Sequence, residues 1–151
     1  MWGGKQLVQL GGQGTAVVSV ATTGDKYYIA VPFRCRPIRV GFTITTAITI
    51  TAAVVNFDRI TYTATGSNTR GDCDVGQITL PISAYAYKCY YDETDASTAI
   101  TTDTWAETLS EGDVIVVQCA TAATAGEGFP FIVVEVDNER PANNANMVQS
   151  A

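Results

Sequence analysis

The stretch that decides the fold class is Pro37–Thr45, PIRVGFTIT. Large apolar side chains stand at every second position from Ile38 to Ile44, and small or polar residues separate them. A period of two residues is typical of a β-strand that has one buried face and one exposed face. We therefore predict a half-buried strand here, and the same signal recurs on both sides of it.

The rest of the chain alternates between runs of β-branched or aromatic residues and groups of turn-forming residues. Apolar residues do not recur at the spacing of a helix, and β-branched side chains lose χ1 freedom in a helix. The further strands are expected at Thr15–Ala21, Lys26–Val31, Ile48–Ile60 (with a bend at its Ala-Ala pair), Gln77–Ser83, Tyr87–Tyr91, Trp105–Leu109, Val114–Ala120 and Phe131–Val136. Short strands at this spacing predict an all-β, antiparallel β-sandwich of jelly-roll-like form, which pattern alone does not separate from a closed barrel.

Both ends of the chain differ from the middle, so we expect a β-sandwich domain at 15–139 between an N-terminal arm at 1–14 and a C-terminal tail at 140–151. Gly-rich and Asn-rich ends are commonly disordered when free, and they can also become ordered on a neighbouring subunit. In the second case Trp2 and Met147 would be apolar anchors. The other residues expected to contact a capsid or a second subunit are Lys5, Arg140, Asn143 and Asn144.

The composition favours a protein that assembles with others. Hydrophobic residues make up 46% of the 151 residues and charged residues only 16%, and small neutral polar residues replace the missing charges. Such surfaces cost less to desolvate than charged ones, although a monomer with a neutral surface would show the same composition. The net charge of −6 opposes binding to the phosphate backbone, so nucleic acid is not an expected partner.

The sequence does not suggest a membrane protein. The first twenty residues lack the apolar core of a signal peptide, and no stretch reaches the roughly 18 apolar residues of a membrane span. We therefore expect synthesis in a cytosol and no membrane partner.

The residues needed for common enzyme chemistry are missing, and we expect neither catalysis nor a cofactor or metal. The chain contains no histidine, which excludes Ser-His-Asp and Cys-His arrangements. Its four cysteines form no C-x-x-C pair, which argues against zinc-ribbon and thioredoxin sites. Cys89 and Cys119 are expected in the core, and Cys73 is expected to be the most exposed.

Three groups of loop carboxylates are candidate sites. Pairs such as Asp72 with Asp74, or Glu111 with Asp113, could serve a glycosidase or bind calcium, but solvated turn residues are the favoured interpretation for all three groups. Arg70-Gly71-Asp72 matches an integrin-binding tripeptide and is also ordinary turn chemistry. The third group is Asp92, Glu93 and Asp95.

Tyrosines cluster between residues 85 and 91. Alternation places Tyr85, Tyr87, Cys89 and Tyr91 on one face of a strand and Tyr90 on the other. Aromatic clusters on β-sandwiches can stack against sugars, and they also fill cores and subunit interfaces. A carbohydrate- or receptor-binding module, such as part of a phage fibre or tail, is therefore the alternative function.

Ser110–Met147, SEGDVIVVQCATAATAGEGFPFIVVEVDNERPANNANM, resembles the ends of small bacteriophage virion proteins of the head decoration or cement type. The matching features are a Glu-Gly-Asp turn, two apolar strands, the Thr-Ala-Gly-rich loop Thr121–Gly128 between them, and a Pro-Asn tail. The Arg-Gly-Asp loop and the four cysteines depart from this pattern.

The resemblance implies a non-enzymatic jelly-roll protein, commonly a homotrimer, that is made in the bacterial cytoplasm and lies on the outer capsid of the virion. There it would stabilise the capsid by contacting the major capsid protein and its own subunits through arms and broad surfaces.

Overall fold

The computed structural model of the chain describes residues 5–12, 17–62, 65–82, 87–91 and 108–137. Across these ranges the regular structure consists of β-strands, and no helix is present. Accordingly, the described residues include no helix long and apolar enough to cross a membrane.

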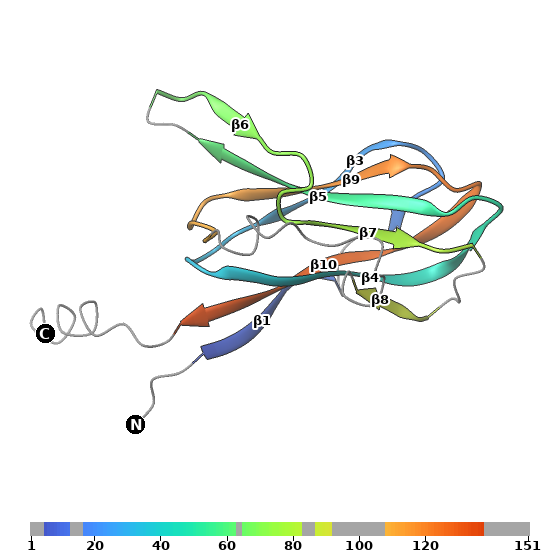
Figure 1. The fold of residues 1–151 in the computed structure, drawn as a ribbon, viewed down its shortest axis with the longest axis horizontal. Coiled ribbons are helices and arrows are strands. Elements are labelled where there is room, and N and C mark those ends of the chain that lie inside the picture. Colours follow the sequence, from blue (N-terminus) through green and yellow to red (C-terminus); the bar gives the residue numbers. More distant parts are fainter. Residues whose placement is uncertain (1–4, 13–16, 63–64, 83–86, 92–107, 138–151) are drawn as a thin grey trace, which may run out of the picture.

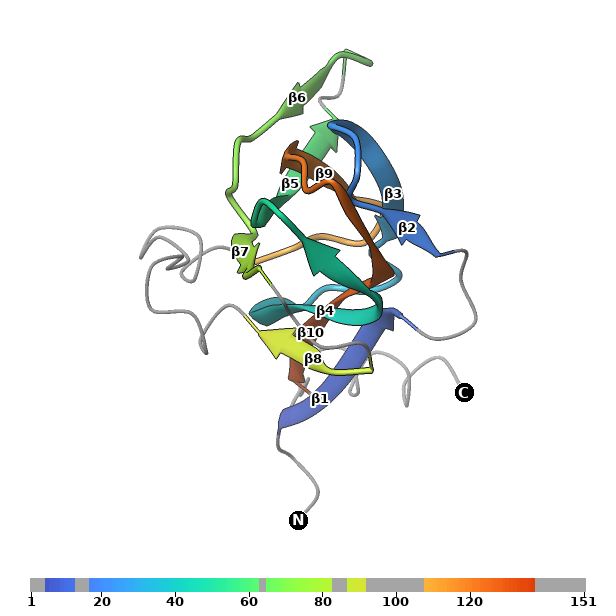
Figure 2. The same ribbon diagram turned by 90° about the vertical axis from the view of Figure 1, so that its right-hand side faces the viewer.

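The strands form two antiparallel sheets that pack face to face as two layers (Figures 1 and 2). The first sheet has the order β1 (Lys5–Gly11), β10 (Ala125–Asp137), β4 (Arg36–Thr49), β8 (Cys89–Tyr91), and β2 (Val18–Ser19) also pairs with β10. The second sheet has the order β3 (Gly24–Ala30), β9 (Val114–Thr121), β5 (Ala53–Tyr62), and both β6 (Asn68–Arg70) and β7 (Gly76–Leu80) pair with β5.

This strand order is that of a jelly roll. β6 pairs with the last residues of β5 and β7 with the first, so together they act as one edge strand interrupted at 71–75. The two sheets then read β1-β10-β4-β8 and β3-β9-β5-β6/β7, and most connections cross from one sheet to the other. The predicted antiparallel sandwich is confirmed.

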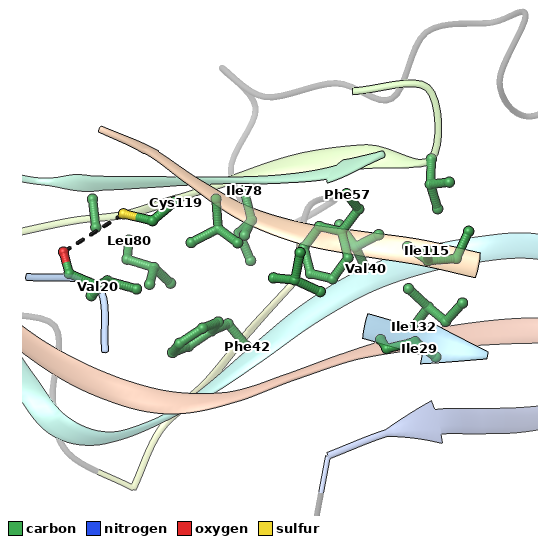
Figure 3. Packing of buried hydrophobic residues seen from close by; sticks show 14 of the residues in the cluster. Val20, Ile29, Val40, Phe42, Phe57, Ile78, Leu80, Ile115, Cys119 and Ile132 are labelled. Carbon is green, nitrogen blue, oxygen red and sulfur yellow. Dashed lines mark hydrogen bonds between the residues drawn. The ribbon is translucent and has the colours of Figure 1, made fainter. Parts of the chain in front are cut away.

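The core lies between the sheets and contains three of the four β4 residues that the alternation predicted, whereas Ile38 lies at a register shift and is only half-buried. Val40, Phe42 and Ile44 of β4 are fully buried. In Figure 3 the side chain of Phe42 lies below and that of Phe57 above, and both point into the space between the two layers. The same close-up shows the Cys119 thiol directed at the carbonyl oxygen of Val20, 3.7 Å away, so the predicted core position of Cys119 is confirmed.

Residues 5–11 differ from the prediction, because they form strand β1 inside the segment assigned to an N-terminal arm. β1 pairs with β10 from Lys5↔Asp137 to Gly11↔Phe131. Val8 and Leu10 alternate toward the core and pack against it. Gly11 and Gly12 take φ angles of 81° and 94°, which only glycine adopts readily, so the pair ends the strand.

Other element bounds shift in ways that pairing explains. The predicted run Ile48–Ile60 divides at residues 50–52, next to its Ala-Ala pair, into β4 of one sheet and β5 of the other. β6 lies between the expected strands Ile48–Ile60 and Gln77–Ser83, where no strand was predicted, and β10 begins at Ala125 inside the predicted loop Thr121–Gly128. Of the expected strand Trp105–Leu109, residues 105–107 lie outside the described residues.

Candidate binding site on the outer face of the first sheet

One row of residues crosses the outer face of the first sheet. In register, Gly11 of β1 lies beside Phe131 of β10, then comes Gly41 of β4, and then Tyr91 of β8. A Cβ atom on Gly41 would lie 2.2 Å from Cζ of Phe131, so the phenyl ring lies directly over the glycine. Its edge meets the Tyr91 ring, with the centroids 5.7 Å apart and the planes at 83°. The missing side chain of Gly41 therefore makes the space in which two aromatic rings meet.

A hollow of about 410 Å³ opens beside these rings, in the size range of small-ligand sites. Residues of β1, β4, β8 and β10 line it, together with Gly12 and Tyr87, which lie just outside strands. Aromatic rings and small polar side chains make up most of its lining. The lining residues are Gln9, Gly12, Thr43, Thr45, Tyr87, Cys89, Tyr91, Phe129 and Phe131.

Tyr87 stands at the hollow in a strained backbone conformation. Its φ is 63°, a left-handed value that is an outlier for a bulky residue. The backbone N–H of Tyr87 donates to the Ile44 carbonyl, and the Ile44 N–H donates to the Lys88 carbonyl at 2.9 Å. Two residues thus face one across the ladder, as in a β-bulge, and the Tyr87 side chain is left 86% exposed.

The electrostatic character of the hollow is neutral, because no lining residue carries a formal charge. A cation lies beside one of the lining rings: the guanidinium carbon of Arg39 is 5.0 Å from the centroid of the Tyr91 ring. A cation over an aromatic face holds the ring by its quadrupole. Arg39 therefore helps to fix Tyr91, and the hollow itself suits an uncharged ligand that combines apolar and hydrogen-bonding surface.

The predicted alternation of the tyrosines is confirmed for the described residues. Tyr87, Cys89 and Tyr91 line the hollow, whereas Tyr90 turns inward and packs against the core. Cys89 was expected in the core, and that was wrong, because its position on β8 faces outward with Tyr91. Tyr85 lies outside the described residues.

The outer face of the second sheet differs, because the interruption between β6 and β7 covers part of it. Arg70 at the end of β6 donates two hydrogen bonds to Asp25 of β3, at 2.7 and 2.8 Å. It donates two more to the buried Asp58 of β5, at 2.8 and 3.0 Å. Cys73 completes the arrangement, since its backbone N–H donates to the other oxygen of Asp58 at 2.8 Å.

These contacts give the Arg-Gly-Asp tripeptide a structural role. The Arg70 guanidinium is occupied by two carboxylates, which raise its pKa. A Cβ on Gly71 would lie 2.2 Å from the Asp74 carboxylate, so glycine leaves room for that carboxylate. The carboxylate accepts a hydrogen bond from the backbone N–H of Arg59 at 2.7 Å. Asp72 is exposed to solvent, and so is Arg70, but the Arg70 guanidinium is held by its two ion pairs. The contacts of Arg70 and Gly71 thus agree with the interpretation of the tripeptide as turn chemistry.

One group in the described residues brings metal-ligand atoms together, but its chemistry does not suit a metal. The candidate atoms of Asp58, Asp72 and Cys73 lie within 4.8 Å of one another. Both Asp58 oxygens already accept hydrogen bonds, and Arg70 places a positive charge beside them. Burial, and then the nearby Asp72, raise the pKa of the Cys73 thiol to about 12, so the thiolate needed for metal binding is disfavoured.

Of the remaining loop carboxylates, Asp113 has structural partners in the described residues. Asp113 accepts hydrogen bonds at 2.9 Å from Arg59 Nε and from the Ser110 N–H, and it lies at 8% exposure just before β9. Glu111 beside it is exposed. Asp92, Glu93 and Asp95 lie outside the described residues.

The residues predicted from the sequence to contact a partner lie almost entirely beyond the described ranges. Only Lys5 is included, as the first residue of β1 opposite Asp137 of β10. The others, which lie outside the described residues, are Trp2, Arg140, Asn143, Asn144 and Met147. Conversely, sequence reasoning missed Phe129, Phe131 and the threonines of β4 as parts of a site, because no local signal joins them to the tyrosines.

The chain matches no protein-family model, no curated protein and no solved structure at a significant level. Arguments about its function therefore depend on the fold and on the surfaces described above.

Proposed function

We propose that this protein is a non-enzymatic structural protein of a bacteriophage virion, which decorates and stabilises the outer capsid as a homotrimer. The observation that carries the proposal is the register Lys5↔Asp137 at one corner of the sandwich. Figure 1 shows the start of β1 and the end of β10 side by side at this corner. Segments 1–4 and 138–151 are therefore joined to the fold at one place, from which both can reach the same neighbour.

The edge beside that corner supports the same proposal. β1 is the terminal strand of its sheet, and among the described residues it pairs with β10 alone. Terminal strands can add a strand from another chain, which gives backbone hydrogen bonds across an interface. Leu7, at the middle of β1, is 62% exposed on the outer face. An apolar side chain on an open edge suits contact with a second subunit or with the capsid.

The jelly roll is compatible with this role but does not by itself assign it. The fold occurs in viral capsid proteins and in lectins, and one fold hosts many functions. Three features of the sequence further support the virion assignment. They are the resemblance of Ser110–Met147 to decoration proteins, the low charge of the chain and its lack of histidine.

The test combines oligomeric state with binding to capsids. Light scattering should give the mass of a trimer, and the protein should bind capsids of the phage that encodes it in a sedimentation assay. Removing residues 1–4 and 138–151 together should weaken trimerisation or capsid binding by at least tenfold, with thermal unfolding unchanged. A folded monomer that does not bind these capsids would contradict the proposal.

A further inference from the structure

We infer that the hollow on the outer face of the first sheet is a binding site for a neutral saccharide, which takes one pyranose ring of a glycan. The inference concerns a different part of the molecule from the corner argued above, and it does not depend on the virion assignment. It rests on the composition of the hollow, on the conformation of Tyr87 and on the contrast between the two outer faces.

The lining has the two kinds of surface that a sugar presents. A pyranose ring has apolar C–H faces and a rim of hydroxyl groups. Tyr87, Tyr91 and Phe129 offer ring surface for the faces, while Thr43, Thr45 and Gln9 provide hydroxyl and amide groups for the rim. A purely hydrophobic ligand would leave these polar groups desolvated without partners, which is unfavourable.

Charge narrows the class of ligand further. The lining carries no formal charge, and the chain as a whole carries −6. A nucleotide, a sugar phosphate or a sialylated glycan would bring negative charge to a site without a cation in its lining. A neutral hexose, or a neutral oligosaccharide that presents one, avoids this repulsion.

Tyr87 provides the independent observation that this face is functional. The residue is 86% exposed, so burial does not account for a large aromatic side chain on a left-handed backbone. Backbone strain of this kind is found most often at binding and active sites, where the surrounding structure holds a side chain in place. Here the bulge opposite Ile44 holds the ring at the hollow.

The described part of the opposite face has a different character, because Arg70, Asp25 and Asp58 form an ion-pair network across it. Tyr28 of β3 is exposed there, at 58%, but it lines neither this hollow nor the polar pocket around Arg59 and Asp113. Tyr87 inside the proposed site and Tyr28 outside it are both exposed, so Tyr28 makes a matched control.

The experiment titrates the intact protein with the methyl glycosides of glucose, galactose, mannose and N-acetylglucosamine, and it follows tyrosine fluorescence and amide NMR shifts. At least one glycoside should bind with a Kd in the millimolar range, as expected for a small polar ligand in an open site. Tyr87→Ala should weaken this binding at least tenfold, and Tyr28→Ala should leave it within twofold.

Two more variants separate the contributions of the lining. Thr43→Val keeps the shape of the side chain but removes its hydroxyl, and it should weaken binding severalfold. Cys89 lies in the hollow, so its alkylation with N-ethylmaleimide should block the sugar, and Cys89→Ser should abolish that sensitivity. Cys35 and Cys119 are buried, and burial raises the pKa of Cys73, so these thiols should react more slowly.

The inference is wrong if no binding of any of the four glycosides is detected, even when their concentrations are raised well above the millimolar range. It is equally wrong if the glycosides bind but Tyr87→Ala and Tyr28→Ala weaken binding to the same extent. Binding of an anionic sugar in preference to all neutral ones would also overturn it.

Discussion

At the scale of the residue, small side chains decide where large ones lie. Gly41 and Phe131 face each other on β4 and β10, and the ring occupies the volume that any other residue at position 41 would need. Gly71 plays the same part for the Asp74 carboxylate in the second sheet. Both glycines can be recognised in the sequence, but the groups that need their space lie on partners that only the fold identifies.

The contact between Gly41 and Phe131 predicts strong coupling between these two positions. Gly41→Ala should destabilise the protein by about 1–3 kcal/mol, because its Cβ would overlap the Phe131 ring. In a Phe131→Ala background the same change should cost almost nothing, since the ring is gone. Urea unfolding of the four proteins of this double-mutant cycle measures the coupling. Additive effects, with a coupling below about 0.5 kcal/mol, would contradict the packing described here.

The ion pair between Arg70 and Asp25 predicts a dependence of stability on pH. The hydrogen bonds from Arg70 hold the pKa of the Asp25 carboxyl below its usual value of 3.8. A lowered folded pKa means that the pair stabilises the protein fully above the unfolded pKa, and that this contribution is lost as pH falls through the folded pKa. Asp25→Asn should therefore destabilise the protein at pH 7, by less than about 1 kcal/mol because both side chains are partly exposed.

The measurement compares urea unfolding of Asp25→Asn and the unchanged protein between pH 7 and pH 2. The difference between them should shrink below pH 4 and should also shrink at high salt, which screens exposed pairs. Asp72→Asn is the control, since Asp72 is exposed and its side chain makes no ion pair with Arg70. A difference that stays constant down to pH 2 would show that Asp25 acts by something other than its charge.

At the scale of the element, pairing with a neighbouring strand decides which segments become strands where the local sequence pattern does not. The alternation in Ile38–Ile44 is strong enough to predict β4 and its buried face, and the same period separated Tyr90 from Tyr91. β1 was missed because only Val8 and Leu10 carry its buried pattern, between glycines that suggest a flexible arm. β6 is polar throughout and owes its strand conformation to β5. The hollow combines residues from distant segments, so its lining could not be predicted before the register was known.

The role of β1 predicts different results for two N-terminal deletions. Removing residues 1–11 deletes the strand, exposes the edge of β10, and takes away the packing of Val8 and Leu10 on the core. The free energy of unfolding should fall by about 2–5 kcal/mol, as expected from the loss of two partly buried apolar side chains and a row of backbone hydrogen bonds. Urea unfolding measures this loss.

Removing residues 1–4 is the matched control, since it stops before the first paired residue, Lys5. The free energy of unfolding should then change by less than about 0.5 kcal/mol. Equal stability of the two deletion variants would mean that β1 contributes nothing to the isolated fold.

At the scale of the whole molecule, the two proposed surfaces lie toward opposite ends of β1. The corner at Lys5 and Asp137 carries both terminal segments, whereas Gly12 and Phe129 border the hollow. From Lys5 at the corner to Gln9, the first residue of β1 that lines the hollow, the strand advances about 13 Å, at roughly 3.3 Å per residue. A subunit attached to a partner through the corner could therefore still present the hollow to solvent. This arrangement makes assembly and saccharide binding separable by mutation.

A pair of charge substitutions tests that separation. Leu7→Glu places a carboxylate on the exposed face of the edge strand, where the proposed interface would bury it without a partner, so trimer or capsid binding should weaken at least tenfold. Tyr28→Glu makes a matched change at an exposed position of the second sheet and should leave assembly unaffected. Neither should alter stability by more than about 0.5 kcal/mol, because both side chains are exposed.

Light scattering, capsid sedimentation and the glycoside titration should all be run on both variants. Because Leu7 lies outside the hollow lining, Leu7→Glu should lose assembly and keep glycoside binding. If the two substitutions weaken assembly equally, β1 is not the edge through which the subunits meet.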